Sequence, residues 1–180
     1  MKTDIEKRVF RTEYRVTQKD KDEVPTIEGY SAVFNSDSED MGFIERIAPG
    51  AFKKALKKSD VRSLFNHDPN FVLGRTKSGT LKLTEDETGL RMVTYPPDTQ
   101  LIQDLVAAPI KRGDIDQQSF AFRVAKDTWE DLDKDIPKRT ILEVEELLDV
   151  SVVTYPAYAD TSAALRSLGE ARSAVQGPGS

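Results

Sequence analysis

Two long stretches of alternating residues, 116–126 and 139–154, constrain the fold of this chain most strongly. In the first, residues 118–124 (QSFAFRV) put two phenylalanines and a valine on one face and serine, alanine and arginine on the other. A polar loop with a proline, residues 131–138, joins the two stretches. This pattern predicts a long antiparallel hairpin, with the aromatic face packed in the core of a sheet.

The rest of the chain alternates between short strand patterns and amphipathic helical patterns. Strand patterns cover residues 6–17, 26–34, 43–47 and 61–65, and a hairpin over 81–92. Helical patterns cover residues 49–58, residues 98–109 with a stop at Gly113, and the segment from Asp160 onward. This order predicts an α+β, strand-rich fold, in which an antiparallel β-barrel or curved sheet is surrounded by a few helices.

The length of 180 residues suits one compact domain, and no linker or internal repeat divides the chain. We therefore expect a single domain over residues 1–176. The closing GPGS, residues 177–180, is typical of an expression remnant.

Composition excludes several classes of function. The net charge is −5 and acids and bases are interleaved; the one basic cluster, residues 53–58, reads as a solvated helix face, so no nucleic-acid surface is expected. No apolar run is long enough for a membrane span, and the charged N-terminus has no secretory signal, so we expect a protein made in the cytoplasm. With no cysteine and one histidine, disulfides and thiolate chemistry are excluded, and no metal or other cofactor is expected.

The single histidine, His67, lies where the strand pattern 61–65 ends in the turn NHDP, residues 66–69. Most histidines are structural, but a turn at the rim of a sheet is where catalytic groups are commonly exposed. Histidine side chains titrate close to neutral pH, which suits a general base. His67 is therefore a candidate base.

Ser119 is a candidate nucleophile because the aromatic face of its strand should hold its backbone rigid. We expect its side chain to face outward or into a cleft. If the two long strands pair across a loop centred between residues 134 and 135, Ser119 lies opposite position 150. Asp149 and Ser151 share a face there, so Asp149 can orient His67; the alternative is an ordinary exposed strand carboxylate.

Several separated segments, spread over roughly residues 26–162, also resemble those of a known family. They are GYSAVF (29–34), FIERIAPGAF (43–52), NHD (66–68), LGR (73–75), GDI (113–115), QSFAF (118–122), EV (143–144) and DVSVVTYPAY (149–158). Their order and spacing resemble those of the prohead maturation serine protease family of tailed bacteriophages (caudoviruses). That family is similar in fold to the herpesvirus assemblin protease, so the resemblance implies an assemblin-like fold.

The resemblance implies that His67 and Ser119 are catalytic, because the family's histidine lies in the Asn-His-Asp turn and its serine in the Ser-Phe strand. Assemblins use a second histidine, which this chain lacks. An acid near the end of the last strand should replace it, and Asp149 is preferred to Glu145 or Glu146.

An oxyanion hole is required by acyl-transfer chemistry, and Arg75 and Arg123 are the candidates to support one.

The implied function is a serine endopeptidase that cleaves the scaffolding region of the phage capsid protein, and itself, inside the immature capsid (prohead) in the bacterial host. Because herpesvirus relatives dimerise through a helix, a homodimer is a further expectation. The alternative is a non-enzymatic capsid-assembly or scaffolding protein of the same fold. Ala121, where the family often has glycine, favours that alternative slightly.

Overall fold

The computed structural model describes residues 3–18, 20, 23, 25–156 and 160–177. Residues 157 and 158, at the end of the last family-like segment, and residues 178–180 of the expected remnant therefore lie outside the described part.

The main sheet is built on the predicted long hairpin. Strands β9 (Gln117–Glu130) and β10 (Lys138–Val153) pair antiparallel at its centre. The neighbouring strands follow the order β1-β9-β10-β5-β6, and β4 also pairs with β10. Their bounds are Glu6–Arg11 for β1, Ile44–Ile47 for β4, Arg62–Phe65 for β5 and Asp68–Arg75 for β6. β4 and β5 run parallel to β10, so the sheet is mixed rather than purely antiparallel, because α1 carries the chain from β4 to β5 in the same direction.

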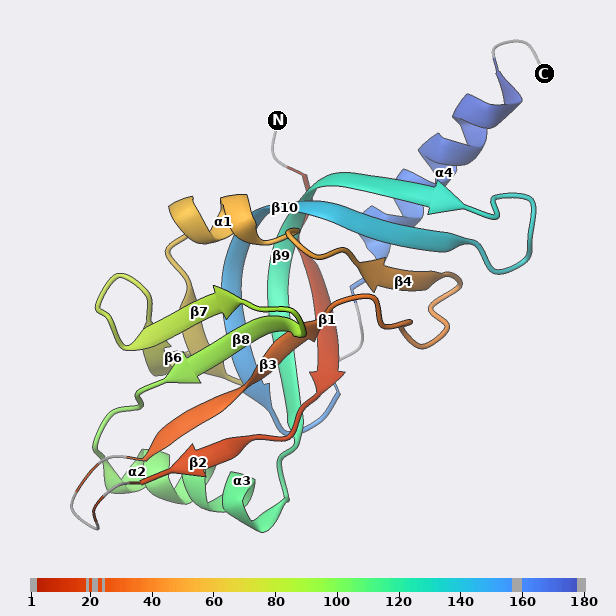
Figure 1. Ribbon diagram of the computed structural model, residues 1–180. Helices are drawn as coiled ribbons and strands as arrows, with labels where there is room; N and C mark the ends of the chain where they lie inside the picture. The colour runs from red at the N-terminus through yellow and green to blue at the C-terminus, as the bar shows by residue number, and fades with distance from the viewer. Residues whose placement is uncertain (1–2, 19, 21–22, 24, 157–159, 178–180) are drawn as a thin grey trace.

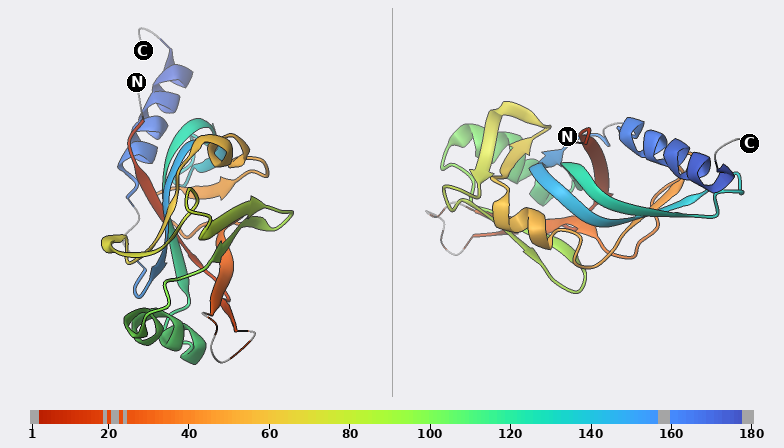
Figure 2. Two further views of the ribbon diagram at one scale, coloured as in Figure 1. Left: turned by 90° about the vertical axis from the view of Figure 1, so that its left-hand side faces the viewer. Right: turned by 90° about the horizontal axis from the view of Figure 1, so that it is seen from above.

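A second, four-stranded sheet packs across one face of the first (Figures 1 and 2). Its strands, in the order β2-β3-β8-β7, are Arg15–Thr17, Thr26–Val33, Gly89–Thr94 and Leu81–Glu85. One hydrophobic core joins the two sheets, and the fully buried Phe120 of β9 lies within it, as the alternation predicts. The α+β, strand-rich class is confirmed. Over the described residues the two sheets do not close into a barrel, so that part of the expectation is not confirmed.

The expected first strand, residues 6–17, is divided between the two sheets. β1 pairs with β9 in the main sheet, whereas β2 pairs with β3 in the second. The chain passes from the main sheet to the second sheet near Thr12, whose backbone N–H donates to Asp116 O at 2.9 Å. β6 was not expected, because its residues lack regular alternation.

The helices lie around the sheets. α1 (Lys53–Lys58) begins later than expected, because Gly50 has φ +87° and interrupts the start. α2 (Gln100–Ile102), the π-helical turn η1 (Gln103–Ala107) and α3 (Ala108–Arg112) form one continuous segment. Pro109, a residue type expected to kink or end a helix, does not end this one. Gly113 closes this segment in the left-handed conformation, as expected. α4 (Ser162–Gln176) projects from the body near the far end of the β9–β10 hairpin (Figure 1). None of the helices in the described ranges is long and apolar enough to cross a membrane.

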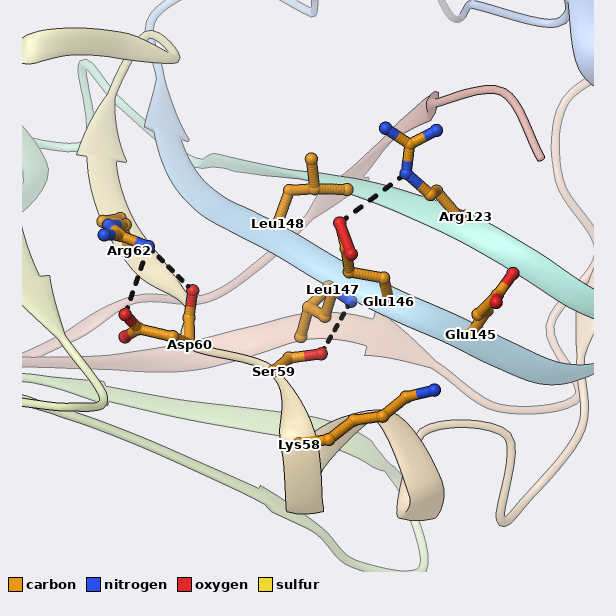
Figure 3. Close-up of a pocket in the computed structure, with 9 residues that line it drawn as sticks. All are labelled: Lys58, Ser59, Asp60, Arg62, Arg123, Glu145, Glu146, Leu147 and Leu148. Atoms are coloured by element: carbon orange, nitrogen blue, oxygen red, sulfur yellow. Dashed lines mark hydrogen bonds and ion pairs between the residues drawn. The ribbon is translucent and has the colours of Figure 1, made fainter. Parts of the chain in front are cut away.

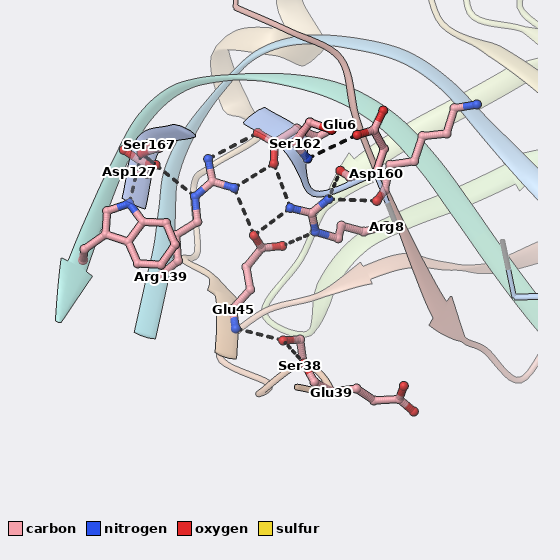
Figure 4. A network of polar contacts seen from close by, with 12 residues as sticks. Glu6, Arg8, Ser38, Glu39, Glu45, Asp127, Arg139, Asp160, Ser162 and Ser167 are labelled. Carbon is pink, nitrogen blue, oxygen red and sulfur yellow. Dashed lines mark hydrogen bonds and ion pairs between the residues drawn. The ribbon is translucent and has the colours of Figure 1, made fainter. Parts of the chain in front are cut away.

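A buried ionic network ties the strands together (Figure 4). Arg8 of β1 and Arg139 of β10 share the carboxylates of Glu6 and Glu45 at 2.6–3.2 Å, and Arg139 also bonds Asp127 of β9 at 2.9 Å. The network therefore fixes β1, β4, β9 and β10 relative to one another.

Candidate active site

A two-residue turn between β5 and β6 carries His67. Asn66 and His67 have φ +54° and +56°, both in the left-handed region. A pair of positive φ values is typical of the type I′ hairpin turn, which usually takes asparagine or glycine. Histidine at such a position is unusual, and a non-glycine residue held there costs about 1–3 kcal/mol. The histidine is thus held in a strained backbone conformation at the rim of the main sheet.

The side chains of His67, Ser119 and Asp149 meet in one hydrogen-bonded line. His67 Nε2 lies 2.7 Å from Ser119 Oγ, and His67 Nδ1 lies 2.6 Å from Asp149 Oδ1. A carboxylate only accepts, so Nδ1 carries the proton and Nε2 presents its lone pair to the serine hydroxyl. This is the relation of nucleophile, base and orienting acid that acyl-transfer enzymes require.

Ser119 is less accessible than its strand pattern predicts. The residue is fully buried, whereas the side chains of His67 and Asp149 are 12% and 16% exposed. β9 lies between β1 and β10, so both of its edges are paired, and His67 Nε2 lies 2.7 Å from the serine hydroxyl. The expectation that the Ser119 side chain faces outward is therefore wrong, because the residue is fully buried.

The register of the long hairpin differs from the prediction by one residue. Ser119 pairs with Ser151 rather than with position 150, and Asp149 pairs with Ala121. The pairing shifts at several points along β10, including between Leu147 and Asp149. An irregularity of this kind adds a residue to one strand and leaves no clear mark in the alternation. The prediction that Asp149 and Ser151 share a face is nevertheless confirmed, because both contact the imidazole.

Ser151 is a member of the cluster that the sequence reasoning did not select. Its Oγ donates to Asp149 Oδ1 at 2.8 Å and lies 3.3 Å from His67 Nδ1, and the residue is fully buried. The sequence did hold a signal for it, because Ser151 lies two residues after Asp149 in an alternating strand and so shares its face. Asp149 Oδ1 is thus held by two hydrogen-bond contacts, one to His67 Nδ1 and one to Ser151 Oγ.

The two alternative acids, Glu145 and Glu146, line a pocket of about 450 Å³ beside β10 (Figure 3). Arg123, on the adjacent strand, forms an ion pair with Glu146 at 3.6 Å. The ring nitrogen that a third catalytic member would orient, His67 Nδ1, is bonded to Asp149 instead. The geometry therefore favours Asp149 among the three candidates.

The two arginines expected near an oxyanion hole already have partners. Arg75 bonds Asp60, and these bonds together with nearby Arg62 lower the pKa of the Asp60 carboxyl to about 2. Arg123 donates to the backbone oxygen of Thr3 as well as pairing with Glu146. The assignment of oxyanion donors stays a prediction.

A hollow of about 370 Å³ adjoins the imidazole. Its lining consists of Asn66, His67, Val153, Thr154 and Tyr155, and Tyr155 is 79% exposed. Within the described part of the chain, no group of three or more histidine, cysteine, aspartate or glutamate side chains is arranged to hold a metal ion.

Comparison with protein families gives one match of wide coverage. The model of the family described as caudovirus prohead serine protease matches residues 12–173. Neither the search of curated proteins nor the search of solved structures found a match.

Proposed function

The chain belongs to the caudovirus prohead serine protease family, and on that premise we propose that it is a serine endopeptidase with Ser119 as nucleophile, His67 as general base and Asp149 as orienting acid. The observation that carries the proposal is the line of two hydrogen bonds, 2.7 Å from His67 Nε2 to Ser119 Oγ and 2.6 Å from His67 Nδ1 to Asp149 Oδ1. The matched region, and the one core that joins both sheets, support a single domain over residues 1–176.

The reaction is acyl transfer in two halves. In the first, Ser119 Oγ attacks the peptide carbonyl carbon while His67 Nε2 takes the hydroxyl proton; the carbon–nitrogen bond then breaks and Nε2 returns the proton to the leaving amine. In the second, water attacks the acyl-enzyme, Nε2 accepts a proton from it, and the proton passes to Ser119 Oγ as the acid product leaves. Asp149 stabilises the imidazolium in both halves and keeps the Nδ1–H tautomer.

The substrates follow from the family. We propose that the scaffolding region of the phage capsid protein is cleaved, together with the protease itself, inside the prohead in the bacterial host. A homodimer remains part of this proposal. Because Ser119 is buried, a peptide must displace part of its cover, and the hollow beside His67 is the side from which the imidazole is reached.

The non-enzymatic alternative is not favoured. It drew slight support from Ala121, which carries one methyl group more than the glycine that the family often has at this position. Ala121 is buried opposite Asp149, and the Nε2–Oγ distance beside it is still 2.7 Å. The extra methyl therefore gives no reason to prefer a scaffolding role.

The test is the Ser119→Ala variant co-produced with its capsid protein. We expect the variant to fold and enter the prohead, and the scaffolding region to stay uncut. Ser173→Ala is the matched control, because Ser173 lies on an exposed part of α4 and should leave processing unchanged. Normal processing by Ser119→Ala would overturn the nucleophile assignment.

A further inference from the structure

We propose that Asn66 is a positioning residue that clamps the His67 turn to β10 and so sets the distance between the imidazole and Ser119. The inference rests on the proposed function, because it assigns Asn66 a role in that same site. Asn66 touches none of the reacting atoms and acts only through His67.

The backbone of the turn creates the need for a clamp. His67 has φ +56°, a conformation that a side chain with a Cβ atom disfavours, and no glycine is present in the turn to relieve it. If released, the turn would relax toward negative φ and carry the imidazole to another place. The position of the His67 imidazole therefore depends on the contacts that hold the turn in this conformation.

Three hydrogen bonds from Asn66 supply that hold. Its backbone N–H donates to Val152 O at 2.8 Å, its Oδ1 accepts from the Thr154 backbone N–H at 2.9 Å, and its Nδ2 donates to Thr154 Oγ1 at 3.3 Å. Two of these bonds use the side chain, and they join the turn to Thr154, the residue that directly follows β10.

The anchor strand is the one that also carries Asp149. β10 pairs in register with the nucleophile strand, with Ser151 opposite Ser119. A clamp onto β10 therefore places base, acid and nucleophile in one rigid frame. Because a displacement of about 1 Å in a catalytic group can reduce the rate about 100-fold, loss of the clamp should appear in kcat rather than in KM.

The test substitution is Asn66→Gly. Glycine accepts the positive φ and keeps the backbone N–H, but removes both side-chain bonds, so it separates the clamp from the turn conformation. We expect kcat to fall about 10- to 100-fold with KM within about threefold of the unchanged protein. Asn35→Gly is the matched control: Asn35 also has positive φ, +55°, in the turn after β3. It should leave kcat unchanged.

A second readout does not depend on proteolysis. His67 is the only histidine in the chain, so the ring ¹H–¹⁵N signals of histidine report this imidazole alone. In Asn66→Gly we expect the Nδ1–H signal of the ring bonded to Asp149 to shift and broaden, whereas in Asn35→Gly it should not. If Ser119→Ala still cleaves while Asn66→Gly alters the ring signals, the catalytic assignment fails and the clamp stands.

Two milder variants complete the test. Asn66→Asp keeps the Oδ1 acceptor for the Thr154 N–H and should restore most of kcat, measured on the pH plateau. Thr154→Val removes only the 3.3 Å bond and should reduce kcat about two- to fivefold. If Asn66→Gly does not fold, Thr154→Val decides the question. Unchanged kcat and unchanged ring signals in Asn66→Gly, or in Thr154→Val where Asn66→Gly does not fold, would overturn the proposal.

Discussion

Replacement of Arg139 by methionine tests how the fold holds the strands of the site in place. Arg139 is 2% exposed and its guanidinium group bonds Glu6 at 2.8 and 3.2 Å, Glu45 at 3.0 Å and Asp127 at 2.9 Å (Figure 4). Methionine keeps much of the side-chain volume but removes the charge. Glu6 and Glu45 then share the guanidinium group of Arg8, and Asp127 keeps the hydroxyl of Ser167 but loses its guanidinium partner.

The magnitude follows from that imbalance. Removal of one partner from a buried ion pair costs about 3–5 kcal/mol, because a charge is left without compensation. A domain of this kind has a free energy of unfolding of about 5–15 kcal/mol, so the loss is about a fifth of the total or more. With a urea m-value of about 2 kcal/mol per molar, the unfolding midpoint should fall by on the order of 2 M.

The assay is urea unfolding followed by tryptophan fluorescence at neutral pH, with the m-value compared between variants. Arg91→Met is the control, because Arg91 pairs with Glu28 at the surface at 3.0 Å with 45% of its side chain exposed. That pair should contribute under about 1 kcal/mol. If Arg139→Met loses no more stability than Arg91→Met, the network does not hold the strands and the reasoning is refuted.

Two predictions concern the site. Asp149→Asn should lower kcat about 100- to 10,000-fold, because the Nδ1–H tautomer loses its carboxylate, whereas Glu145→Gln and Glu146→Gln should stay close to the unchanged protein; peptide-cleavage kinetics would show the reverse order if the acid is misassigned. Ser151→Ala should lower kcat about 3- to 30-fold with little change in KM, and a larger effect on KM would argue against an orienting bond to Asp149.

The sequence predicted the elements whose pattern is long and regular. The β9–β10 hairpin followed from alternation over more than ten residues, and the second-sheet hairpin followed from paired leucines and a polar turn. β6 was missed because Asp68–Arg75 lacks alternation and owes its strand conformation to pairing with β5. The break at Thr12 was missed for a similar reason, since only tertiary packing decides that β1 and β2 enter different sheets.

The candidate site was only partly predictable. The local sequence pattern predicted that His67 lies in a turn at the rim of a sheet and that Asp149 shares a face with Ser151. The family resemblance was needed to single out Ser119. The irregular pairing of β10 places Ser151 opposite the nucleophile. A register calculated from the position of the loop alone cannot include such a shift. The positive φ of His67 was also beyond sequence reasoning, because a turn without glycine gives no sign of it.

Burial of Ser119 has a consequence for how activity is measured. A bulky substrate needs the cover over the hydroxyl to move, whereas a small reagent needs less displacement. A small serine-directed probe therefore separates the chemistry of the cluster from the entry of a protein substrate.

The most direct measurement of the central claim is labelling with a small fluorophosphonate, with the modified residue located by mass spectrometry. A hydroxyl activated by an imidazole at 2.7 Å should give stoichiometric phosphonylation at Ser119, and His67→Ala should lose it. An unlabelled Ser119, modification of a different serine, or equal labelling without the imidazole would contradict the account.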